Sequence, residues 1–277
     1  MADFYRVAQK ATDIFCTFSD EKPDLVDIGI PAFAERVGGL FQGNTMVIGA
    51  AQNVGKTSFV QRMLLESKDK GGVVSCEDGE DVWGCRILAQ EARLSPTKIR
   101  RDDLTHDERE RLREAVEALE RRSLEGTLPE VMVRIGANWD DLEKAAELMA
   151  ERGCRYAILD YLQKVRGMAS ERRHEVAGTL NRWHKFCTKN GMVPIALSQV
   201  VRMPKTKEPY PWHLKESGDL ENEARIIIML WRDGEDELTM RCKVAKSSLG
   251  GGGHQFAYRF DDNEQLSPYK DDPFEEY

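Results

Sequence analysis

Short apolar runs alternate along this chain with stretches in which apolar residues recur at a helical spacing. The runs are apolar almost throughout, as in TMVIGA (45–50), YAILDY (156–161) and VPIALSQ (193–199). Continuous apolar runs of this length are typical of parallel strands that helices cover on both faces. The pattern therefore predicts an α/β fold, in which a twisted, mostly parallel sheet has helices on both faces.

The remaining elements follow the same alternation. Further strands are expected in GGVVSCE (71–77), VMVRIG (131–136), ARIIIMLW (224–231), LTMRCKV (238–244) and HQFAYRF (254–260). Helices are expected from Lys56 to Ser67, near 80–93, over 140–152 and over 171–190. The last strands of the series are able to pair antiparallel.

The pattern divides the chain into three parts. Residues 1–27 are predicted to form an N-terminal arm or linker helix, because apolar residues recur near a helical period before the polar break SDEKPD. Residues 28–262 hold the predicted sheet and form the main domain. Residues 263–277 are predicted to be an acidic tail, which either docks on a basic partner protein or only keeps the chain in solution.

One junction between a predicted strand and a helix carries most of a phosphate-binding loop, in GAAQNVGKTSFVQ (49–61). The full pattern GxxxxGK[ST] requires a Gly where this chain has Ala50, but Gly55, Lys56 and Thr57 are all present. Gly55 lets backbone amides approach the phosphates, Lys56 reaches the β- and γ-phosphate oxygens, and Thr57 ligates Mg²⁺. Asn53 stands where many such loops have a second Gly, and Asn also tolerates a left-handed backbone.

The flanking elements agree with this interpretation, because a helix that begins after the loop places its positive end beneath a bound anion. We therefore expect ATP and Mg²⁺ as cofactors. The predicted nucleotide-binding residues are Ala50, Gln52, Asn53, Val54, Gly55, Lys56, Thr57 and Ser58.

Two carboxylates end separate predicted strands. Asp160 follows four largely apolar residues in YAILDY, and Glu77 ends GGVVSCE. Carboxylates at strand ends can order Mg²⁺ and the attacking water, so Asp160 is the candidate magnesium ligand beside Thr57 and Glu77 the candidate general base. Each acid alone is equally well explained as an exposed carboxylate, and their joint occurrence in one sheet favours the site.

Several motifs occur in a single order over residues 28–262. They are FAERVGGL, VIGAAQNVGKTSF, VVSCEDGEDVWGCRILAQEARL, YAILDYLQ, EVAGTLNRWHKFCTKNGMVPIALSQVVR, HLKESGDLENEARIIIMLWRD and KVAK. In these motifs the chain resembles the RecA-like motor domain of DnaB-type replicative helicases, the superfamily 4 hexameric helicases. The resemblance implies a RecA-like P-loop NTPase fold and an ATP-dependent helicase or translocase that acts in DNA replication. It also implies a homo-oligomeric ring, a hexamer, that holds single-stranded DNA in its channel.

The resemblance also implies residue roles. Lys56 and Thr57 bind phosphate and magnesium, Glu77 activates water, Asp160 orders magnesium and Gln199 senses the γ-phosphate. An uncharged donor at a strand end, such as Gln199, can signal the phosphate state to the loop that follows it.

The loop after Gln199, VVRMPKTKEPYPWHLKESG (200–218), mixes basic and aromatic residues. Basic groups meet phosphates and aromatic rings stack on bases, so this composition predicts single-strand binding. By resemblance the ESG stretch contacts the DNA backbone, with Lys215 where the family usually has Arg. The predicted DNA-binding residues are Arg202, Lys205, Lys207, Lys215, Glu216 and Gly218, and a solvated, proline-stiffened surface loop is the alternative.

The chain departs from the family pattern late in the domain. The family usually has a Lys-x-Arg pair whose Arg reaches the neighbouring subunit's γ-phosphate, and here Lys246 matches the Lys while Ser248 occupies the Arg position. An arginine finger contributes about 10³–10⁵ in rate, so its absence argues against efficient hydrolysis. Lys246, predicted to be catalytic, and Arg241 are the partial substitutes that we consider.

Three functions follow from these observations. A helicase or translocase is the leading one, and Ser248 favours the alternative of a slow or inactive ATP-binding module that binds DNA or regulates a replication partner as a switch. A recombinase-like filament is the third, which a helical assembly would reveal. Only about 27 residues precede the motor-like region, so we expect no primase recruitment through an N-terminal domain, and a phage or mobile element as the source.

Charge and hydropathy set outer limits on these functions. The net charge of −8 argues against a protein that coats polyanions, so DNA contacts must come from local basic loops. No stretch approaches the roughly 18 uncharged apolar residues of a membrane helix, and the N-terminus MADFYRVAQK lacks a signal-peptide apolar region. We expect a cytoplasmic protein with no membrane contact.

Overall fold

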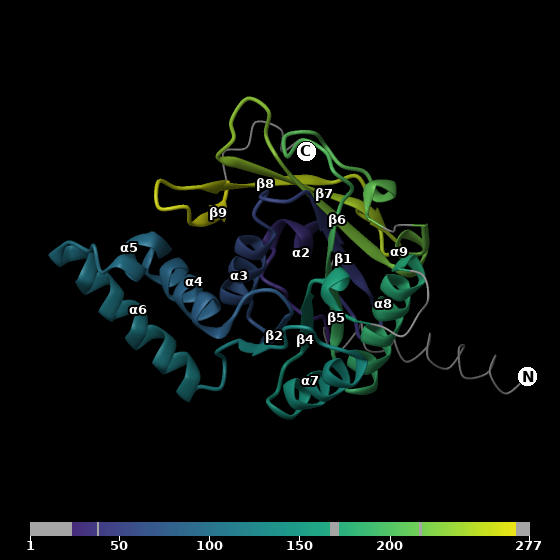
Figure 1. Cartoon of the computed structure of the whole chain (residues 1–277), viewed down its shortest axis with the longest axis horizontal. Coiled ribbons are helices and arrows are strands. Elements are labelled where there is room, and N and C mark those ends of the chain that lie inside the picture. The colour runs from purple at the N-terminus through teal and green to yellow at the C-terminus, as the bar shows by residue number, and fades with distance from the viewer. Residues whose placement is uncertain (1–23, 38, 167–171, 216–217, 270–277) are drawn as a thin grey trace, which may run out of the picture.

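The structure is a computed structural model that describes residues 24–37, 39–166, 172–215 and 218–269. One mixed sheet forms its centre. The strand order is β3-β2-β4-β5-β1-β6-β7-β8-β9 (Figure 1). The strands are β1 (Met46–Ala50), β2 (Gly71–Ser75), β3 (Glu130–Val133), β4 (Tyr156–Asp160), β5 (Val193–Gln199), β6 (Ile226–Arg232), β7 (Thr239–Ser247), β8 (Gln255–Phe260) and β9 (Leu266–Pro268). Strands β1 to β6 run parallel, and β7, β8 and β9 continue the sheet antiparallel.

Helices cover both faces of the parallel strands (Figure 1). Helices α7 and α8 pack on each other and on β2, β4 and β5, while α3 and α4 pack together on the other side. The helices are α2 (Pro31–Val37), α3 (Lys56–Glu66), α4 (Glu80–Ala92), α5 (Pro96–Arg101), α6 (His106–Leu124), α7 (Trp139–Glu151), α8 (Arg172–Lys189) and α9 (Gly218–Glu223), with 3-10 turns η1 (Leu162–Lys164) and η2 (Pro211–His213). The predicted α/β fold is therefore confirmed.

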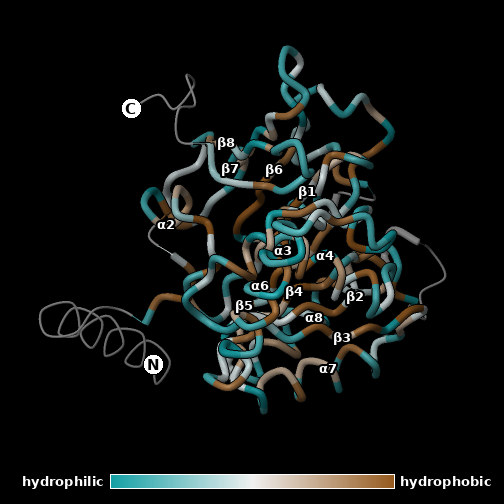
Figure 2. Tube along the Cα trace, turned by 90° about the vertical axis from the view of Figure 1, so that its left-hand side faces the viewer, coloured by the Kyte–Doolittle hydropathy of each residue, from teal (hydrophilic) through white to brown (hydrophobic). Residues whose placement is uncertain are grey.

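The apolar runs form the core for the reason that the pattern suggested. Every residue of β1, β2 and β4 is buried, as expected for strands with a covered face on each side. Figure 2 shows the hydrophobic segments gathered in the inner strands, with hydrophilic segments in the peripheral loops. Because β1 lies between β5 and β6, the loop that follows β1 emerges beside the ends of both neighbours.

The sheet continues beyond the predicted domain boundary at residue 262. Strand β9 pairs with β8, and its Leu266 is fully buried. Gln90 Nε2 of α4 donates to the Leu266 carbonyl at 2.9 Å, and Gln265 Nε2 donates to the Leu94 carbonyl at 2.9 Å. The predicted tail over 263–277 thus begins inside the fold, and a three-residue strand among polar residues gave no apolar run to reveal it.

The predicted start of the domain at residue 28 lies slightly too late in the chain. Most of the predicted arm, residues 1–23, lies outside the described residues. Val26 is buried and forms an isolated bridge to Leu40, and Ser67 Oγ donates to the Asp27 carbonyl at 2.7 Å. The fold therefore includes residues before position 28.

The burial of Leu266 predicts a loss of stability on truncation of its side chain. Leu266→Ala should lower the free energy of unfolding by about 2–4 kcal/mol, because it leaves a cavity in the core beside β9. Leu124→Ala is the matched control, since Leu124 is 90% exposed and the same truncation there should change stability by no more than about 0.5 kcal/mol. Urea unfolding measures both, and equal midpoints for Leu266→Ala and wild type would restore the tail interpretation.

Candidate nucleotide-binding site

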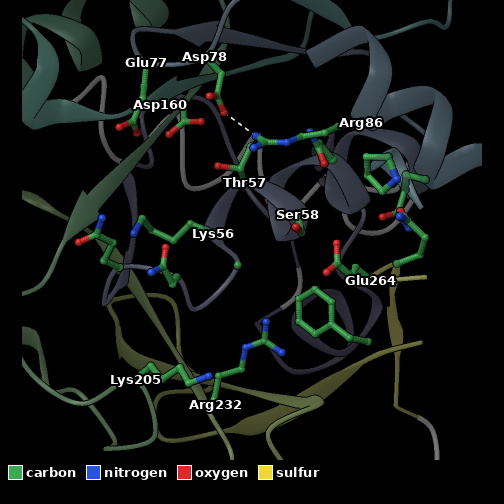
Figure 3. A pocket seen from close by; sticks show the side chains of 18 of the residues that line it. Lys56, Thr57, Ser58, Glu77, Asp78, Arg86, Asp160, Lys205, Arg232 and Glu264 are labelled. Carbon is green, nitrogen blue, oxygen red and sulfur yellow. Dashed lines mark hydrogen bonds and ion pairs between the residues drawn. The ribbon is translucent and has the colours of Figure 1, made fainter. Parts of the chain in front are cut away.

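A cavity of about 660 Å³ opens at the carboxyl ends of the parallel strands (Figure 3). The loop after β1 forms one side of it, and residues at the ends of β2, β4, β5, β6 and β8 line it together with residues of α4 and of several loops. Most of the predicted nucleotide-binding residues line this cavity, namely Gln52, Asn53, Gly55, Lys56, Thr57 and Ser58. Ala50 and Val54 are buried and are not among the lining residues.

The loop after β1 has the backbone that a phosphate cradle requires. Asn53 has φ 62° and Gly55 has φ 113°, so both positions adopt left-handed conformations. A Cβ added at Gly55 would lie 2.9 Å from Met240 Cε and 2.9 Å from Phe260 Cζ, so Gly is required there for space as well as for conformation. Helix α3 begins immediately afterwards at Lys56, and its first residues line the cavity.

Lys56 and Asp160 form the charged centre of the cavity. Lys56 Nζ donates to the carbonyl oxygens of Ala50 at 3.2 Å and Ala51 at 3.4 Å. Burial lowers the pKa of Lys56, and the nearby Asp160 and Glu77 partly offset that effect. Burial likewise raises the pKa of Asp160 to about 7, with Lys56 acting in the opposite direction. A ligand that brought its own charges would relieve both desolvated groups.

Strand register brings Glu77 beside Asp160. Ser75 on β2 pairs with Asp160 on β4, and the Cys76 amide donates to the Asp160 carbonyl at 2.7 Å. Just beyond that pair, Glu77 lines the cavity, and its Oε1 lies 3.3 Å from Lys164 Nζ. Figure 3 shows both carboxylates on the same side of the cavity, above Lys56.

Oxygen donors suited to a magnesium ion are present among these residues. The Thr57 hydroxyl and the Asp160 carboxylate both line the cavity, and Mg²⁺ prefers one or two protein carboxylates together with phosphate oxygens. The buried carboxylate of Asp160, whose ionisation is opposed by desolvation, fits a position that a cation completes.

The cavity includes charged residues that the sequence analysis missed. Arg86 of α4 donates from Nη1 to Asp78 Oδ2 at 2.5 Å (Figure 3). Asp78 follows the predicted base Glu77 directly, and Arg86 lies further along the chain, in the middle of α4. Both residues lie within the motif VVSCEDGEDVWGCRILAQEARL, and proximity to Glu77 was a further signal for Asp78, but neither was assigned a role.

A second missed pair lies at the opposite end of the cavity. The guanidinium carbon of Arg232 lies 3.8 Å from the centre of the Phe260 ring, and Arg232 Nη1 donates to the Glu237 carbonyl at 2.9 Å. Burial lowers the pKa of Arg232. Arg232 ends the run ARIIIMLWR and Phe260 ends HQFAYRF, so the strand-end rule that selected Asp160 would also have selected this pair.

Gln199 connects the cavity with the predicted DNA-binding loop. It lines the cavity at the end of β5, and its carbonyl accepts from the Lys215 amide at 2.8 Å. Gln163 bridges the same region, since its Oε1 accepts from the Gln199 amide at 3.3 Å and its Nε2 donates to Ser198 Oγ at 2.9 Å.

The loop after β5 folds back on itself. The Val201 amide donates to the His213 carbonyl at 2.7 Å, and the rings of Tyr210 and Trp212 stack in parallel with centroids 4.6 Å apart. Trp212 is 61% exposed, and the predicted DNA-binding cations Arg202, Lys207 and Lys215 are also exposed. Gly218 begins α9, and the predicted contact Glu216 lies outside the described residues.

Lys205 differs from the other cations of that loop. It lines the nucleotide cavity (Figure 3). Its Nζ lies 2.5 Å from Glu237 Oε2. The Arg232 amide donates to the Lys205 carbonyl at 2.8 Å, which holds this part of the loop against the end of β6. The structure thus places Lys205 at the cavity, and its predicted DNA-binding role stays a prediction.

The late cations lie away from the cavity of this chain. Lys246 Nζ donates to the Glu221 carbonyl at 2.5 Å, and Arg241 Nε donates to Asp233 Oδ2 at 2.8 Å. Neither residue is among the cavity lining, and Ser248 is exposed in the turn after β7. The predicted catalytic role of Lys246 thus requires a second copy of the chain.

Comparison with known families agrees with this geometry. Residues 26–255 match the family model described as DnaB-like helicase C terminal domain. The chain belongs to this family. The match ends at the start of β8, so it includes the phosphate loop, both carboxylates and Gln199.

Individual proteins show the extent of the similarity. The replicative DNA helicase DnaC of Bacillus subtilis is 29% identical over 220 residues, which cover 74% of this chain and 47% of that protein. The replicative DNA helicase DnaB of Helicobacter pylori strain 26695 is 29% identical over 238 residues, covering 82% and 48%. The chain therefore spans about half the length of the curated relatives it matches.

Solved structures share the fold at lower identity. A structure described as an ATPase domain superposes with a TM-score of 0.83 at 19% identity, covering 95% of this chain and 99% of that one. A DnaB-like replicative helicase described with its interactions with primase gives a TM-score of 0.80 at 20% identity, covering 92% of this chain and 66% of that one.

In the part of this chain that the structure describes, no helix has both the length and the apolar character to cross a bilayer.

The raised pKa of Asp160 predicts a specific pH dependence of stability in EDTA, without nucleotide. An unfolded Asp has a pKa of about 4, so between about pH 4 and pH 7 the folded form retains a proton that the unfolded form releases. The free energy of unfolding should therefore fall as the pH rises through this window. Asp160→Asn should remove that fall and exceed the wild type in stability at pH 8.

Urea unfolding at pH 5 and pH 8 measures the effect as a difference between variants, so that other titrating groups cancel. Asp81→Asn is the control, because Asp81 is an exposed acid in the first turn of α4. Parallel pH profiles for Asp160→Asn and wild type would show that Asp160 is ionised throughout.

Proposed function

We propose that this chain is the motor domain of an ATP-dependent DNA helicase, which moves along single-stranded DNA during replication. One observation carries the proposal: in a chain of the DnaB-like family, Lys56, Thr57, Glu77 and Asp160 surround a single cavity at a phosphate-loop helix. A protein that only held a nucleotide would need the loop and Lys56 but not a carboxylate placed to activate water.

The reaction that these residues support is hydrolysis of the γ-phosphate bond of ATP. Glu77 accepts a proton from the attacking water, while Lys56 and the amides of the loop offset charge that develops on the phosphate oxygens. Thr57 and Asp160 are the residues that would hold Mg²⁺, which supplies further charge neutralisation when bound. Asp160 must be ionised to hold the cation. Because its buried carboxyl group loses its proton as the pH rises, the nucleotide and its metal ion should bind more tightly at higher pH.

The nucleoside end of ATP has a matching surface at the opposite end of the cavity. The stacked Arg232 guanidinium and Phe260 ring offer flat cationic and aromatic faces to a purine. Both side chains adjoin Gly55, whose missing Cβ lets the Phe260 ring pack directly against the phosphate loop. We infer that adenine packs against this pair.

Nucleic acid is proposed to bind at the exposed part of the loop after β5. The cations Arg202, Lys207 and Lys215 supply phosphate contacts, and the exposed Tyr210–Trp212 stack supplies an aromatic face for bases. The hydrogen bond between the Gln199 carbonyl and the Lys215 amide gives the γ-phosphate end of the cavity a direct connection to this surface.

Efficient turnover is proposed to depend on a ring of several copies, a hexamer as the family resemblance implies. Lys246 lies outside its own chain's cavity, so it can act only on a neighbour's nucleotide, whereas Arg241 is buried against Asp233. Ser248 supplies no charge at the position where the family pattern has Arg. This observation favours the second candidate, a slow nucleotide switch that binds DNA or regulates a replication partner.

The first functional prediction concerns Glu77 and Lys56. Glu77→Gln should lower single-strand-stimulated ATPase by about 10²–10⁴-fold while nucleotide binding persists, because the amide cannot accept the proton. Lys56→Ala should weaken nucleotide binding itself. Steady-state phosphate release and nucleotide titration separate the two effects, and Glu151→Gln, an exposed acid at the end of α7, is the control.

Two outcomes would contradict the motor proposal. Full ATPase activity in Glu77→Gln would remove the general base from the account. Absence of any stimulation by single strands, together with absence of strand separation, would favour the switch.

The second functional prediction uses the unequal exposure of the five tryptophans. Trp83, Trp183 and Trp231 are buried and Trp139 is half-buried, so Trp212 is the most accessible to a base. Single-stranded DNA should quench the intrinsic fluorescence, and Trp212→Ala should abolish most of the quenching and weaken binding by about 1–3 kcal/mol. Trp139→Phe serves as the control, and quenching that survives in Trp212→Ala would place DNA elsewhere.

A further inference from the structure

The 3-10 turn η1 joins the two halves of the proposed mechanism. It begins directly after Tyr161, and the Asp160–Tyr161 pair before it lines the cavity. Leu162 is fully buried and fixes the turn in the core. The next two residues, Gln163 and Lys164, carry polar side chains that contact different parts of the site.

Gln163 reaches toward the proposed DNA-binding loop. Besides its bonds to Ser198 and Gln199, its Nε2 donates to the Lys215 carbonyl at 3.4 Å. The turn therefore lies beside an exposed cation of the loop, and Arg166, two residues after the turn, is exposed as well. Two exposed cations, Lys215 and Arg166, thus belong to the backbone segments next to η1 and are available to a phosphate there.

Lys164 reaches toward the proposed general base. Its Nζ lies 3.3 Å from Glu77 Oε1 and 5.7 Å from the centre of the Tyr161 ring. The Lys164 and Glu77 side chains are 42% and 49% exposed, so the ion pair is open to solvent and its ammonium is open to other anions. Exposed pairs of this kind are weak, which makes exchange of the partner easy.

We propose that Lys164 is a positioning residue shared between Glu77 and a DNA phosphate. In the DNA-free protein it holds the Glu77 carboxylate in an ion pair. A phosphate of single-stranded DNA beside η1 takes over the ammonium, which leaves Glu77 free to accept a proton from water. This inference rests on the proposed function, since it assumes that Glu77 is the base and that DNA binds beside Lys215.

The chemistry of a general base explains why the pair would slow hydrolysis. A base must place a free lone pair within hydrogen-bond reach of the attacking water. An ammonium bound to the same carboxylate occupies one of its oxygens and competes with the water for its orientation. Transfer of the ammonium from Glu77 to a DNA phosphate would therefore raise the rate of ATP hydrolysis when DNA binds, without movement of the sheet.

The test compares Lys164→Met with wild type in ATPase rate and in DNA binding. Without DNA, the variant's ATPase rate should rise about two- to fivefold, the range that corresponds to loss of an exposed ion pair. With saturating single-stranded DNA the two rates should be equal, so the stimulation ratio falls by the same factor. Lys164→Arg should behave as wild type, because it keeps the charge.

A second readout is the salt dependence of binding to a fluorescent oligothymidylate. Loss of one phosphate contact should reduce the slope of log affinity against log salt by about 0.7. Lys189→Met is the matched control, because Lys189 is an exposed lysine paired with Glu147 at 3.3 Å and Glu143 at 3.5 Å on the α7–α8 surface. It should change neither the ATPase ratio nor the salt slope.

Opposite results overturn the inference. A lower DNA-free rate in Lys164→Met would mean that Lys164 assists Glu77, and an unchanged salt slope would mean that no phosphate reaches it. If wild type is stimulated by DNA but Lys164→Met matches it in both readouts, only this inference fails. If wild type shows neither ATPase nor DNA binding, the proposed function fails and this inference fails with it.

Discussion

The site depends on two charges, those of Lys56 and Asp160, that the fold takes out of water before any ligand arrives. Desolvation opposes the ionised form of each, and the neighbouring strands supply only partial compensation. Lys56 rests on two backbone carbonyls, and Asp160 faces further acids in Glu77 and Asp78. A triphosphate with a divalent cation satisfies both groups at once, because it brings negative charge to the lysine and positive charge to the aspartate.

The order of the strands brings the other groups of the proposed mechanism to Lys56 and Asp160. Placing β1 between β5 and β6 sets the phosphate loop beside Gln199 on one side and Arg232 on the other. Placing β4 between β2 and β5 brings Asp160 to Glu77 and η1 to Gln199. Groups from distant parts of the sequence therefore meet at one edge of the sheet, and the loop that carries Lys215 begins at the same edge.

Much of this arrangement could be predicted from the sequence, because buried parallel strands appear as apolar runs and the residues at their carboxyl ends line the site. Asp160 and Glu77 were found by that rule, and Asn53 was expected to accept the left-handed backbone that it adopts. The same rule applies to Arg232 and Phe260, which also end strands, but the family motifs assign no role to either residue. The position of Lys205 at the cavity was not predicted because composition alone cannot tell which side of a loop a cation faces, and β9 was missed because it is too short for a period to appear.

Side-chain partners across the sheet were beyond prediction for a related reason. The contact of Lys164 with Glu77 joins residues far apart in the sequence, and it depends on the register of β2 against β4 and on the turn that follows β4. Likewise, the family resemblance located Lys246 in a motif but gave no view of its bond to the Glu221 carbonyl. A motif shows which position of the family a residue corresponds to. Only the fold shows what its side chain contacts in this chain.

The most direct test of the account is the location of a divalent cation in crystals grown with Mn²⁺ and a non-hydrolysable ATP analogue. The account predicts one anomalous scattering peak between the Thr57 hydroxyl and the Asp160 carboxylate, with the γ-phosphate beside Lys56. A peak elsewhere, or an analogue bound outside the cavity of the phosphate loop, would contradict it.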